Sequence, residues 1–364
     1  MNILIQMVHP AHYYYYKNVI ANLKKNGHRI VIAITTKDLL ETLVRDSGLQ
    51  YVNIQPVSHK RTKIGFIWDM MLREIRMVKL CIKHRIQLLT GSTVEVSTVA
   101  WLLHRFEINI GEDDATVVHK YIKTIAPFVQ TRLTPDTCDN GRIEYKSVHY
   151  SGFLKLAYLH PKVFSPDVNV LRKYIDDSKT FFLLRFSSLK AYHDEGIKGI
   201  SAFVAQRIVN ILSPYGQIFI TSERELEPQF EKYRLNINPL DIHHVLAFAK
   251  LYIGDSQSMA VEAAMLGVPS LRFNDFAGKI GVLEELEHKY ELTLGIPSSE
   301  PQRLYDKVQE LLEMPNLREV FQTRRQKMLS DKIDVTAFFT WFIENYPESR
   351  KIMKENPDYQ YRFK

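Results

Sequence analysis

Short β-rich runs alternate with stretches long enough for a helix along most of this chain, and this alternation limits its fold more than any other feature. In the first half the runs cover residues 3–8, 29–35, 51–54, 86–90, 107–111 and 128–133. Parallel strands need a crossover of about a dozen residues or more, usually a helix, whereas antiparallel strands can be joined by a tight turn. The alternation therefore predicts βαβ units around a parallel sheet.

A second series of the same kind follows, with runs at residues 181–184, 217–221, 251–253, 270–273 and 292–295. Between the two series, Pro161 and Pro166 interrupt the pattern, because proline lacks an amide hydrogen and fixes φ. A chain of 364 residues also exceeds the usual size of one core. We therefore expect an α/β protein with two Rossmann-like, doubly wound domains, residues 1–165 and 166–331, facing each other across a cleft.

The chain reads as helical from Glu300 almost to its end, and residues 337–342 are rich in aromatic side chains. So much apolar surface is more than a terminal tail exposes. We expect residues 332–364 to form a helix and tail that cross back and pack on the first domain.

Composition narrows the class of protein. Hydrophobic residues make up 45% of the chain and charged residues 24%, which is typical of a globular protein. Cys81 and Cys138 lie in no C-x-x-C pair and beside no histidine cluster, so neither a disulfide framework nor a zinc site is expected. Without a basic leader or a run of about 18 apolar residues, the chain is expected to be cytoplasmic. Its net charge of +7 favours anionic partners.

A strand, a loop and a helix succeed one another between residues 251 and 269. Asp255 or Ser256 can cap this helix. The amides of its first turn, which includes Ser258 and Met259, would hold a diphosphate with the help of the positive end of the helix dipole. Open α/β sheets bind ligands at this carboxyl edge of their strands.

Glu262 lies six residues after Ser256, in the second turn of the same helix. Its carboxylate would accept hydrogen bonds from ribose hydroxyls once the phosphates rest on the amides. Ser187 and Ser222, each shortly after an expected strand, join the candidate nucleotide-sugar site. The alternative is an ordinary capped crossover helix with a surface glutamate.

This segment resembles a known one. Residues 253–269 are similar to the nucleotide-binding segment of GT-B glycosyltransferases and of UDP-N-acetylglucosamine 2-epimerases, in which a serine and a glutamate six residues apart contact the nucleotide. Ser256 and Glu262 match those two positions.

Nearly the whole chain resembles the family called domain of unknown function 354, a GT-B relative. The resemblance rests on ordered motifs, namely His9-Pro10-Ala11-His12, Lys17-Asn18, Asp113-Asp114-Ala115, Tyr158-Leu159-His160-Pro161, Phe164-Ser165-Pro166-Asp167, Arg185-Phe186-Ser187, Ala191, His193-Asp194, Gly196 and Glu262-Ala263-Ala264. It implies the GT-B fold. Because one fold serves many chemistries, the activity has to be argued from the site.

Three further residues are candidates for contact with the donor. Arg185 ends the first strand of the second domain, and its planar guanidinium suits the diphosphate that leaves the sugar. His193 and Asp194 follow in a loop bounded by glycine, where they either point into the cleft or form a local turn.

His9 and His12 follow the first strand, in the loop that faces the acceptor in a GT-B protein. An imidazole with a near-neutral pKa would remove the proton of an acceptor hydroxyl as it attacks the anomeric carbon. We favour His12, which is nearer the expected helix start. The alternative is that one of the pair caps or packs the helix.

Clustered acids at positions 112–114 would suit magnesium or manganese, but no further ligands cluster with them. GT-B enzymes generally stabilise the leaving diphosphate with helix amides and basic side chains instead. We therefore expect neither a metal nor another cofactor. Asp114 is assigned to the candidate catalytic set, with helix capping as the alternative.

Cationic and apolar residues are mixed at helical spacing over residues 59–85. Such a surface can rest on anionic lipid, with Phe66 and Trp68 entering the interface, and would place the protein at the inner face of the cell membrane. The alternative is an ordinary amphipathic helix whose apolar stripe belongs to the core.

These residues predict transfer of a sugar from a nucleoside diphosphate donor, UDP being expected, to a hydroxyl acceptor in surface polysaccharide or glycolipid assembly. An epimerase or hydrolase of the 2-epimerase type is the alternative, because residues 238–241 also resemble those enzymes. However, Gln257 and Ser258 replace their glycines, and residues 185–189 replace their His-Arg-Arg-Glu-Asn loop. A non-catalytic nucleotide-sugar binder is the third class. No nucleic-acid-binding motif is present in the sequence.

Overall fold

The structure is a computed structural model that describes residues 1–36, 39–56, 63–188 and 199–364. The chain divides into two compact units. Unit 1 comprises Met1–Tyr158 and Lys332–Lys364, and unit 2 comprises Leu159–Asp331. Residues 159–165 pack with unit 2, where the Phe164 ring lies 4.8 Å from that of His244.

The described part of unit 1 contains one seven-stranded parallel sheet with the order β3-β2-β1-β4-β5-β6-β7. Its strands are β1 (Asn2–Met7), β2 (Arg29–Thr35), β3 (Val52–Gln55), β4 (Leu88–Gly91), β5 (Phe106–Ile110), β6 (Arg132–Pro135) and β7 (Ser147–Tyr150). Ile3 of β1 is paired with Ile30 on one side and with Leu88 on the other. A central strand of this kind is covered on both faces, which explains why β1 is a nearly continuous apolar run.

The helices of unit 1 connect these strands, and the last of them come from the end of the chain. They are α1 (Pro10–Lys25), α2 (Leu40–Asp46), α3 (Lys63–Lys83), α4 (Val94–Leu102), α5 (His119–Ile125), the 3-10 helix η1 (Gly141–Lys146), α14 (Val335–Glu344), α15 (Glu348–Glu355) and the 3-10 helix η4 (Pro357–Phe363). The short α6 (Leu156–Leu159) ends where unit 1 gives way to unit 2.

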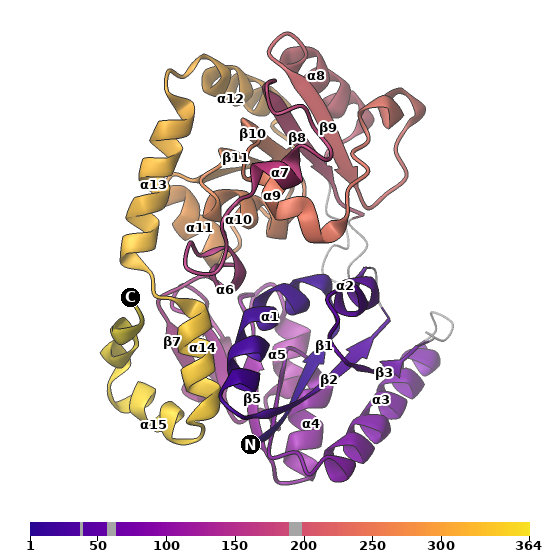
Figure 1. Cartoon of the computed structure of the whole chain (residues 1–364), viewed down its shortest axis with the longest axis vertical. Coiled ribbons are helices and arrows are strands. Elements are labelled where there is room, and N and C mark those ends of the chain that lie inside the picture. Colours follow the sequence, from indigo (N-terminus) through magenta and orange to yellow (C-terminus); the bar gives the residue numbers. More distant parts are fainter. Residues whose placement is uncertain (37–38, 57–62, 189–198) are drawn as a thin grey trace. The chain divides into compact units, whose positions relative to one another are not determined.

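The C-terminal helices return to unit 1, as the aromatic run predicts, and Figure 1 shows α14 alongside α1. Phe338, Phe339 and Phe342 of α14 are buried, and the first two lie against the Tyr150 ring. Thr336 donates a hydrogen bond of 2.7 Å to the carbonyl oxygen of Ala157. Burying three phenylalanines stabilises this packing by several kcal/mol, at roughly 1.5–3 kcal/mol for each side chain.

The described part of unit 2 repeats the architecture with a five-stranded parallel sheet of order β12-β11-β10-β8-β9. Its strands are β8 (Phe181–Phe186), β9 (Gln217–Ser222), β10 (Leu251–Gly254), β11 (Ser270–Phe273) and β12 (Thr293–Ile296). Its helices are α7 (Val168–Leu171), α8 (Ala202–Leu212), η2 (Pro228–Tyr233), η3 (Pro239–Asp241), α9 (Ile242–Leu246), α10 (Gln257–Met265), α11 (Gly281–His288), α12 (Pro301–Glu313) and α13 (Leu317–Asp331).

Each sheet has one place where the direction of strand addition reverses. In unit 1 it lies between β1 and β4, and in unit 2 between β8 and β10. The loops that leave neighbouring strands there run to opposite faces of the sheet, which opens a crevice at the carboxyl ends and is the usual ligand position in such folds. None of the helices among the described residues is both long enough and apolar enough to span a bilayer.

Candidate functional site

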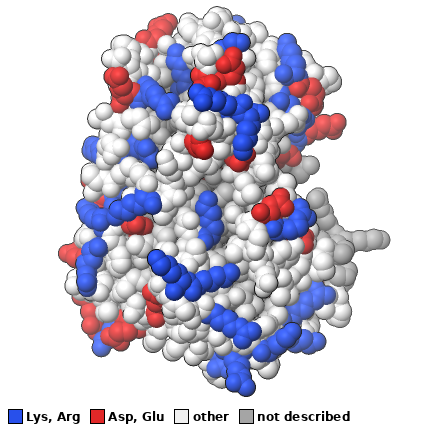
Figure 2. Space-filling model, in the orientation of Figure 1, with Lys and Arg blue, Asp and Glu red and all other residues white. Residues whose placement is uncertain are grey.

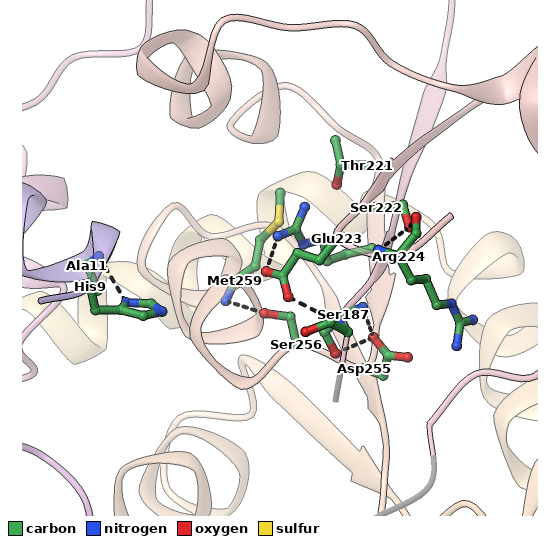
Figure 3. A network of polar contacts seen from close by, with 12 residues as sticks. His9, Ala11, Ser187, Thr221, Ser222, Glu223, Arg224, Asp255, Ser256 and Met259 are labelled. Atoms are coloured by element: carbon green, nitrogen blue, oxygen red, sulfur yellow. Dashed lines mark hydrogen bonds and ion pairs between the residues drawn. The ribbon is translucent and has the colours of Figure 1, made fainter. Parts of the chain in front are cut away.

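Asp255 joins the two loops that meet at the β8/β10 reversal in unit 2. It follows β10, and its Oδ1 accepts hydrogen bonds from the backbone nitrogen of Ser187, at 2.6 Å, and from the hydroxyl of the same serine, at 2.9 Å (Figure 3). Its Oδ2 accepts from the backbone nitrogen of Ile200, at 3.2 Å. Asp255 is 1% exposed, and burial raises the pKa of its carboxyl although these bonds oppose the shift. Asp255 is therefore an internal anchor that positions Ser187.

Ser256 caps α10 at the carboxyl end of β10. Its backbone is extended, and its hydroxyl accepts a hydrogen bond of 3.4 Å from the backbone nitrogen of Met259 (Figure 3). Ser258 lies in the first turn, partly exposed, while Met259 is buried. Gly254 permits the close approach of β10 to β8, since a Cβ there would meet the carbonyl oxygen of Arg185 at 2.9 Å. Of the two caps that the sequence allowed, Asp255 and Ser256, the structure has Ser256. The helix start lies where ligands bind in open sheets.

Polar side chains of β11 and of the loop after it form hydrogen bonds to the start of α10. Asn274 donates a hydrogen bond of 2.9 Å to the carbonyl oxygen of Asp255 and accepts one of 3.3 Å from the side chain of Gln257. Arg272, which is fully buried, donates to the same Gln257 side chain at 3.0 Å. Its Nη2 lies 3.8 Å from a carboxylate oxygen of Glu287. These bonds join the first turn of α10 to Arg272 of β11 and to Asn274 in the loop that follows it.

Glu262 lies in the second turn of α10 and contacts a histidine that the sequence pattern did not single out. Its Oε1 lies 3.2 Å from Nε2 of His243, which belongs to α9. The exposed fractions of the two side chains are 12% for Glu262 and 3% for His243. The glutamate is thus not an ordinary surface residue, because a nearly buried imidazole fixes its orientation. A carboxylate has about four acceptor positions, so this contact leaves capacity for a ligand.

Arg185 is paired within the protein. Its Nη2 donates to Oε1 of Glu223, the residue that follows β9, and Oε2 of the same glutamate accepts from the backbone nitrogen of Ser188 at 3.1 Å. Ser222 forms a tight turn, in which its hydroxyl donates to the carbonyl oxygen of Arg224 at 2.6 Å. Glu223 and Arg224 were not among the expected site residues. His193 and Asp194 lie outside the described residues.

A cavity of about 390 Å³ lies at the carboxyl ends of the strands of unit 2. Its volume is within the range of small-molecule sites. Arg224 follows β9 and Phe273 ends β11, and both line it together with Gly199, Ile200, Ser201, Val204 and Ser298. The cavity therefore adds room for a ligand on the same edge of the sheet as Ser256.

In unit 1, His9 caps α1 and His12 lies within its first turn. Nδ1 of His9 accepts a hydrogen bond of 3.2 Å from the backbone nitrogen of Ala11 (Figure 3), and Nδ1 of His12 accepts one of 3.3 Å from that of Val8. A neutral imidazole that accepts at Nδ1 carries its proton on Nε2. Both rings are therefore donors at Nε2 in their neutral forms. His9 is thus a helix cap, which was the alternative to a catalytic role. For either histidine to act as a base at Nε2, its ring would have to carry the proton on Nδ1.

The acidic segment after β5 is largely engaged in local structure. Asp114 is 8% exposed, and its Oδ1 accepts a hydrogen bond of 2.8 Å from the backbone nitrogen of Asp139. Glu112 forms an ion pair with the buried Lys155. Asp113 is exposed. Within the described ranges, no three side chains of the histidine, cysteine, aspartate and glutamate types come together as a metal site would need.

The family model described as "Protein of unknown function (DUF354)" matches residues 1–276. No curated protein sequence shows a significant match to this one.

Solved structures of sugar-processing proteins share the fold. A spinosyn rhamnosyltransferase complexed with thymidine diphosphate has a TM-score of 0.61 at 12% identity, over 94% of this chain and 100% of that one. The UDP-GlcNAc 2-epimerase from Neisseria meningitidis bound to UDP-GlcNAc has a TM-score of 0.60 at 13% identity, over 91% and 100%. A calicheamicin glycosyltransferase has a TM-score of 0.59 at 13% identity, over 95% and 99%. At these identities the similarity establishes the GT-B fold.

Proposed function

This chain belongs to the family of proteins of unknown function called DUF354, and we propose that it transfers a sugar from a nucleoside diphosphate donor, with UDP as the expected carrier, to a hydroxyl acceptor. The observation that carries the proposal is the arrangement of α10, which begins with the Ser256 cap at the β8/β10 reversal and holds Glu262 against His243 one turn deeper.

The donor would be held by charge and by hydrogen bonds from unit 2. The amides of the first turn of α10 and its positive dipole end suit a diphosphate, and the Glu262 carboxylate suits the ribose hydroxyls. The buried Arg272 and Asn274 support this, because both bond to the side chain of Gln257 in that turn. Two proteins of the same fold hold thymidine diphosphate and UDP-GlcNAc, which supports a nucleotide-sugar site of this type.

Arg185 would also contribute to donor binding. Its Nη2 donates to Glu223, but a guanidinium has five N–H donors, so donors remain for the leaving diphosphate while the pair with Glu223 persists. Because Glu223 already neutralises much of this charge, we expect the helix amides and Glu262 to contribute most of the affinity for the nucleotide.

Unit 1 would supply the acceptor side. The acceptor oxygen forms a bond with the anomeric carbon while the bond from that carbon to the diphosphate oxygen breaks, and the hydroxyl proton passes to His9 or His12. The receiving ring must first hold its proton on Nδ1, which gives up the backbone hydrogen bond seen here. No metal or other cofactor enters the proposed reaction. The acceptor that we propose is a hydroxyl of a growing surface polysaccharide or glycolipid.

Calorimetry with UDP, thymidine diphosphate and ADP tests the donor site directly. We expect the wild-type protein to bind the pyrimidine diphosphates, and to release free sugar slowly when UDP-GlcNAc is supplied without an acceptor. Failure of every nucleotide to bind would overturn the proposal. Binding without any turnover in the presence of hydroxyl acceptors would favour a non-catalytic binder instead.

Epimerisation of the sugar nucleotide is the second candidate. It is favoured by the shared fold of the 2-epimerase and by residues 238–241, which comprise η3 with its cap Asn238 and precede α9, the helix that carries His243. An epimerase of this type would exchange the C2 hydrogen of UDP-GlcNAc with solvent, whereas a transferase leaves that hydrogen in place. Nuclear magnetic resonance in deuterated water distinguishes the two.

A further inference from the structure

Helix α3 carries a row of exposed apolar side chains that the core does not cover. Trp68, Met71, Ile75 and Ile82 are 53%, 46%, 48% and 65% exposed. Their spacing of three, four and seven residues places them on one face of the helix. The core contacts of α3 come from other positions, Met77, Leu80 and Cys81, so this face is not the one that packs on the sheet.

Three cations adjoin this row. Arg76, Lys79 and Lys83 are exposed, and their spacing of three and four residues forms a second row beside the apolar one. Figure 2 shows Lys and Arg side chains over the part of the surface where Figure 1 places α3. The same three cations line a cavity of about 220 Å³, whose remaining lining residues are Val52, Asn53, Ile54 and Leu80.

Acidic side chains of α3 do not share this surface. Asp69 is 6% exposed. Glu74 accepts a hydrogen bond of 2.6 Å from the hydroxyl of Thr98 on α4. The exposed face of α3 is therefore apolar and cationic together, which is the pattern of a helix that lies in a membrane interface.

We propose that this face of α3 rests on an anionic lipid bilayer, with Trp68, Met71, Ile75 and Ile82 in the interfacial region and a lipid phosphate in the cavity between Arg76, Lys79 and Lys83. The charges favour lipid over a second copy of this face, because two such faces would repel each other. Helix α3 follows β3, so Trp68 near its start lies toward the carboxyl edge of the sheet, the edge that carries His9. Membrane attachment there would bring a lipid-linked hydroxyl to unit 1. The attachment itself does not depend on the proposed sugar transfer.

Co-sedimentation of the whole protein with vesicles tests whether the cations of α3 contribute to lipid binding. We expect binding to phosphatidylglycerol vesicles and none to phosphatidylcholine vesicles. The double variant Lys79→Glu/Lys83→Glu should lose at least about 25-fold in affinity, since each cation near an anionic surface contributes about fivefold. The matched variant Lys24→Glu/Lys25→Glu has the same change in net charge, on exposed residues of α1, and should bind like the wild type.

Tryptophan fluorescence tests whether the apolar row of α3 enters the lipid interface. With Trp101 and Trp341 replaced by phenylalanine, Trp68 is the sole remaining tryptophan, and its emission should shift to the blue on phosphatidylglycerol vesicles. The variant Ile75→Ser/Ile82→Ser should weaken binding, whereas Phe203→Ser, which removes a side chain that is 79% exposed on unit 2, should not. The unfolding midpoint of each variant confirms that it is folded.

Three results would overturn the proposal: equal binding to both lipids, equal loss in the two charge variants, or an unshifted Trp68 emission. Self-association in solution that Ile75→Ser/Ile82→Ser abolishes would also overturn it, because the face would then be a protein interface. Loss of nucleotide binding in a Glu262 variant that still binds vesicles would leave the proposal intact, so the two proposals fail separately.

Discussion

Glu262 is the residue on which the nucleotide assignment can be tested most sharply. Replacing it by alanine removes the carboxylate that would accept hydrogen bonds from the ribose. A hydrogen bond to a charged group contributes about 1.5–3 kcal/mol. Loss of one such bond corresponds to a weakening of UDP binding by about 10- to 150-fold. Calorimetry of the wild-type and variant proteins at the same pH and salt concentration measures this directly.

The same substitution also affects folding, because His243 loses its contact. Its side chain is 3% exposed and lies 3.2 Å from Glu262. Removing a contact of a buried polar group costs up to about 1–3 kcal/mol of unfolding free energy. Urea denaturation of Glu262→Ala should therefore show lower stability as well as weaker binding. Glu262→Gln is nearly isosteric and should retain more stability, while still losing the charge that strengthens the ribose contact.

Two controls separate binding from stability. Glu319→Ala removes an exposed glutamate from the first turn of α13 and should change neither quantity. His243→Gln leaves Glu262 in place but changes the group that orients it, so UDP affinity should fall less than in Glu262→Ala. If UDP affinity is the same in the wild type and in folded Glu262→Ala, the assignment of the helix start to a nucleotide is wrong.

Three further predictions concern charge and hydrogen bonding. Burial raises the pKa of Glu107 from its usual 4.5 to about 7, so the folded state holds its proton more tightly than the unfolded chain. The stability of the wild type relative to Glu107→Gln should therefore fall by about 3 kcal/mol as pH rises from 4 to above 7, measured by urea denaturation across that range; a flat difference would contradict this. His9→Asn keeps a cap acceptor and should match the wild type in stability, yet slow turnover by about 10²–10⁴-fold if His9 is the base, and unchanged turnover would remove that role. Ser187→Ala deletes one donor to the buried Asp255 and should cost about 1.5–3 kcal/mol in chemical unfolding, whereas Ser188→Ala, which leaves that contact intact, should cost much less.

The sequence predicted the architecture well because the signals for it are local. Alternating β-rich runs and helical stretches gave two parallel-sheet halves, and the structure has them. The aromatic run at residues 337–342 predicted that the C-terminal helix returns to the first domain, and α14 packs on α1. Strand β7 was not expected, because the four residues Ser147–Tyr150 are too few to show a periodic pattern. It forms through pairing with β6, which a linear pattern does not reveal.

The two ends of helix α10 in the candidate site could also be predicted from the sequence. Asp255 or Ser256 was expected to cap α10, and Ser256 does so, because its short hydroxyl side chain reaches the backbone nitrogen of Met259 three residues later. Gly267 ends α10 at a φ of 69°, a conformation that favours glycine wherever it occurs. These features depend on residues three or four apart, so the order of residue types is enough to predict them.

The amino-acid sequence by itself thus determined the two βα series, the caps and the apolar return of the C-terminus, because propensity and short-range hydrogen bonds act between near neighbours. Only the tertiary structure decided that Glu262 contacts His243, that Arg185 pairs with Glu223 and that Asp255 holds Ser187. Each of these pairs joins different strands, helices or loops. Their meeting depends on strand register and on how helices pack over the sheet, which the whole core fixes at once.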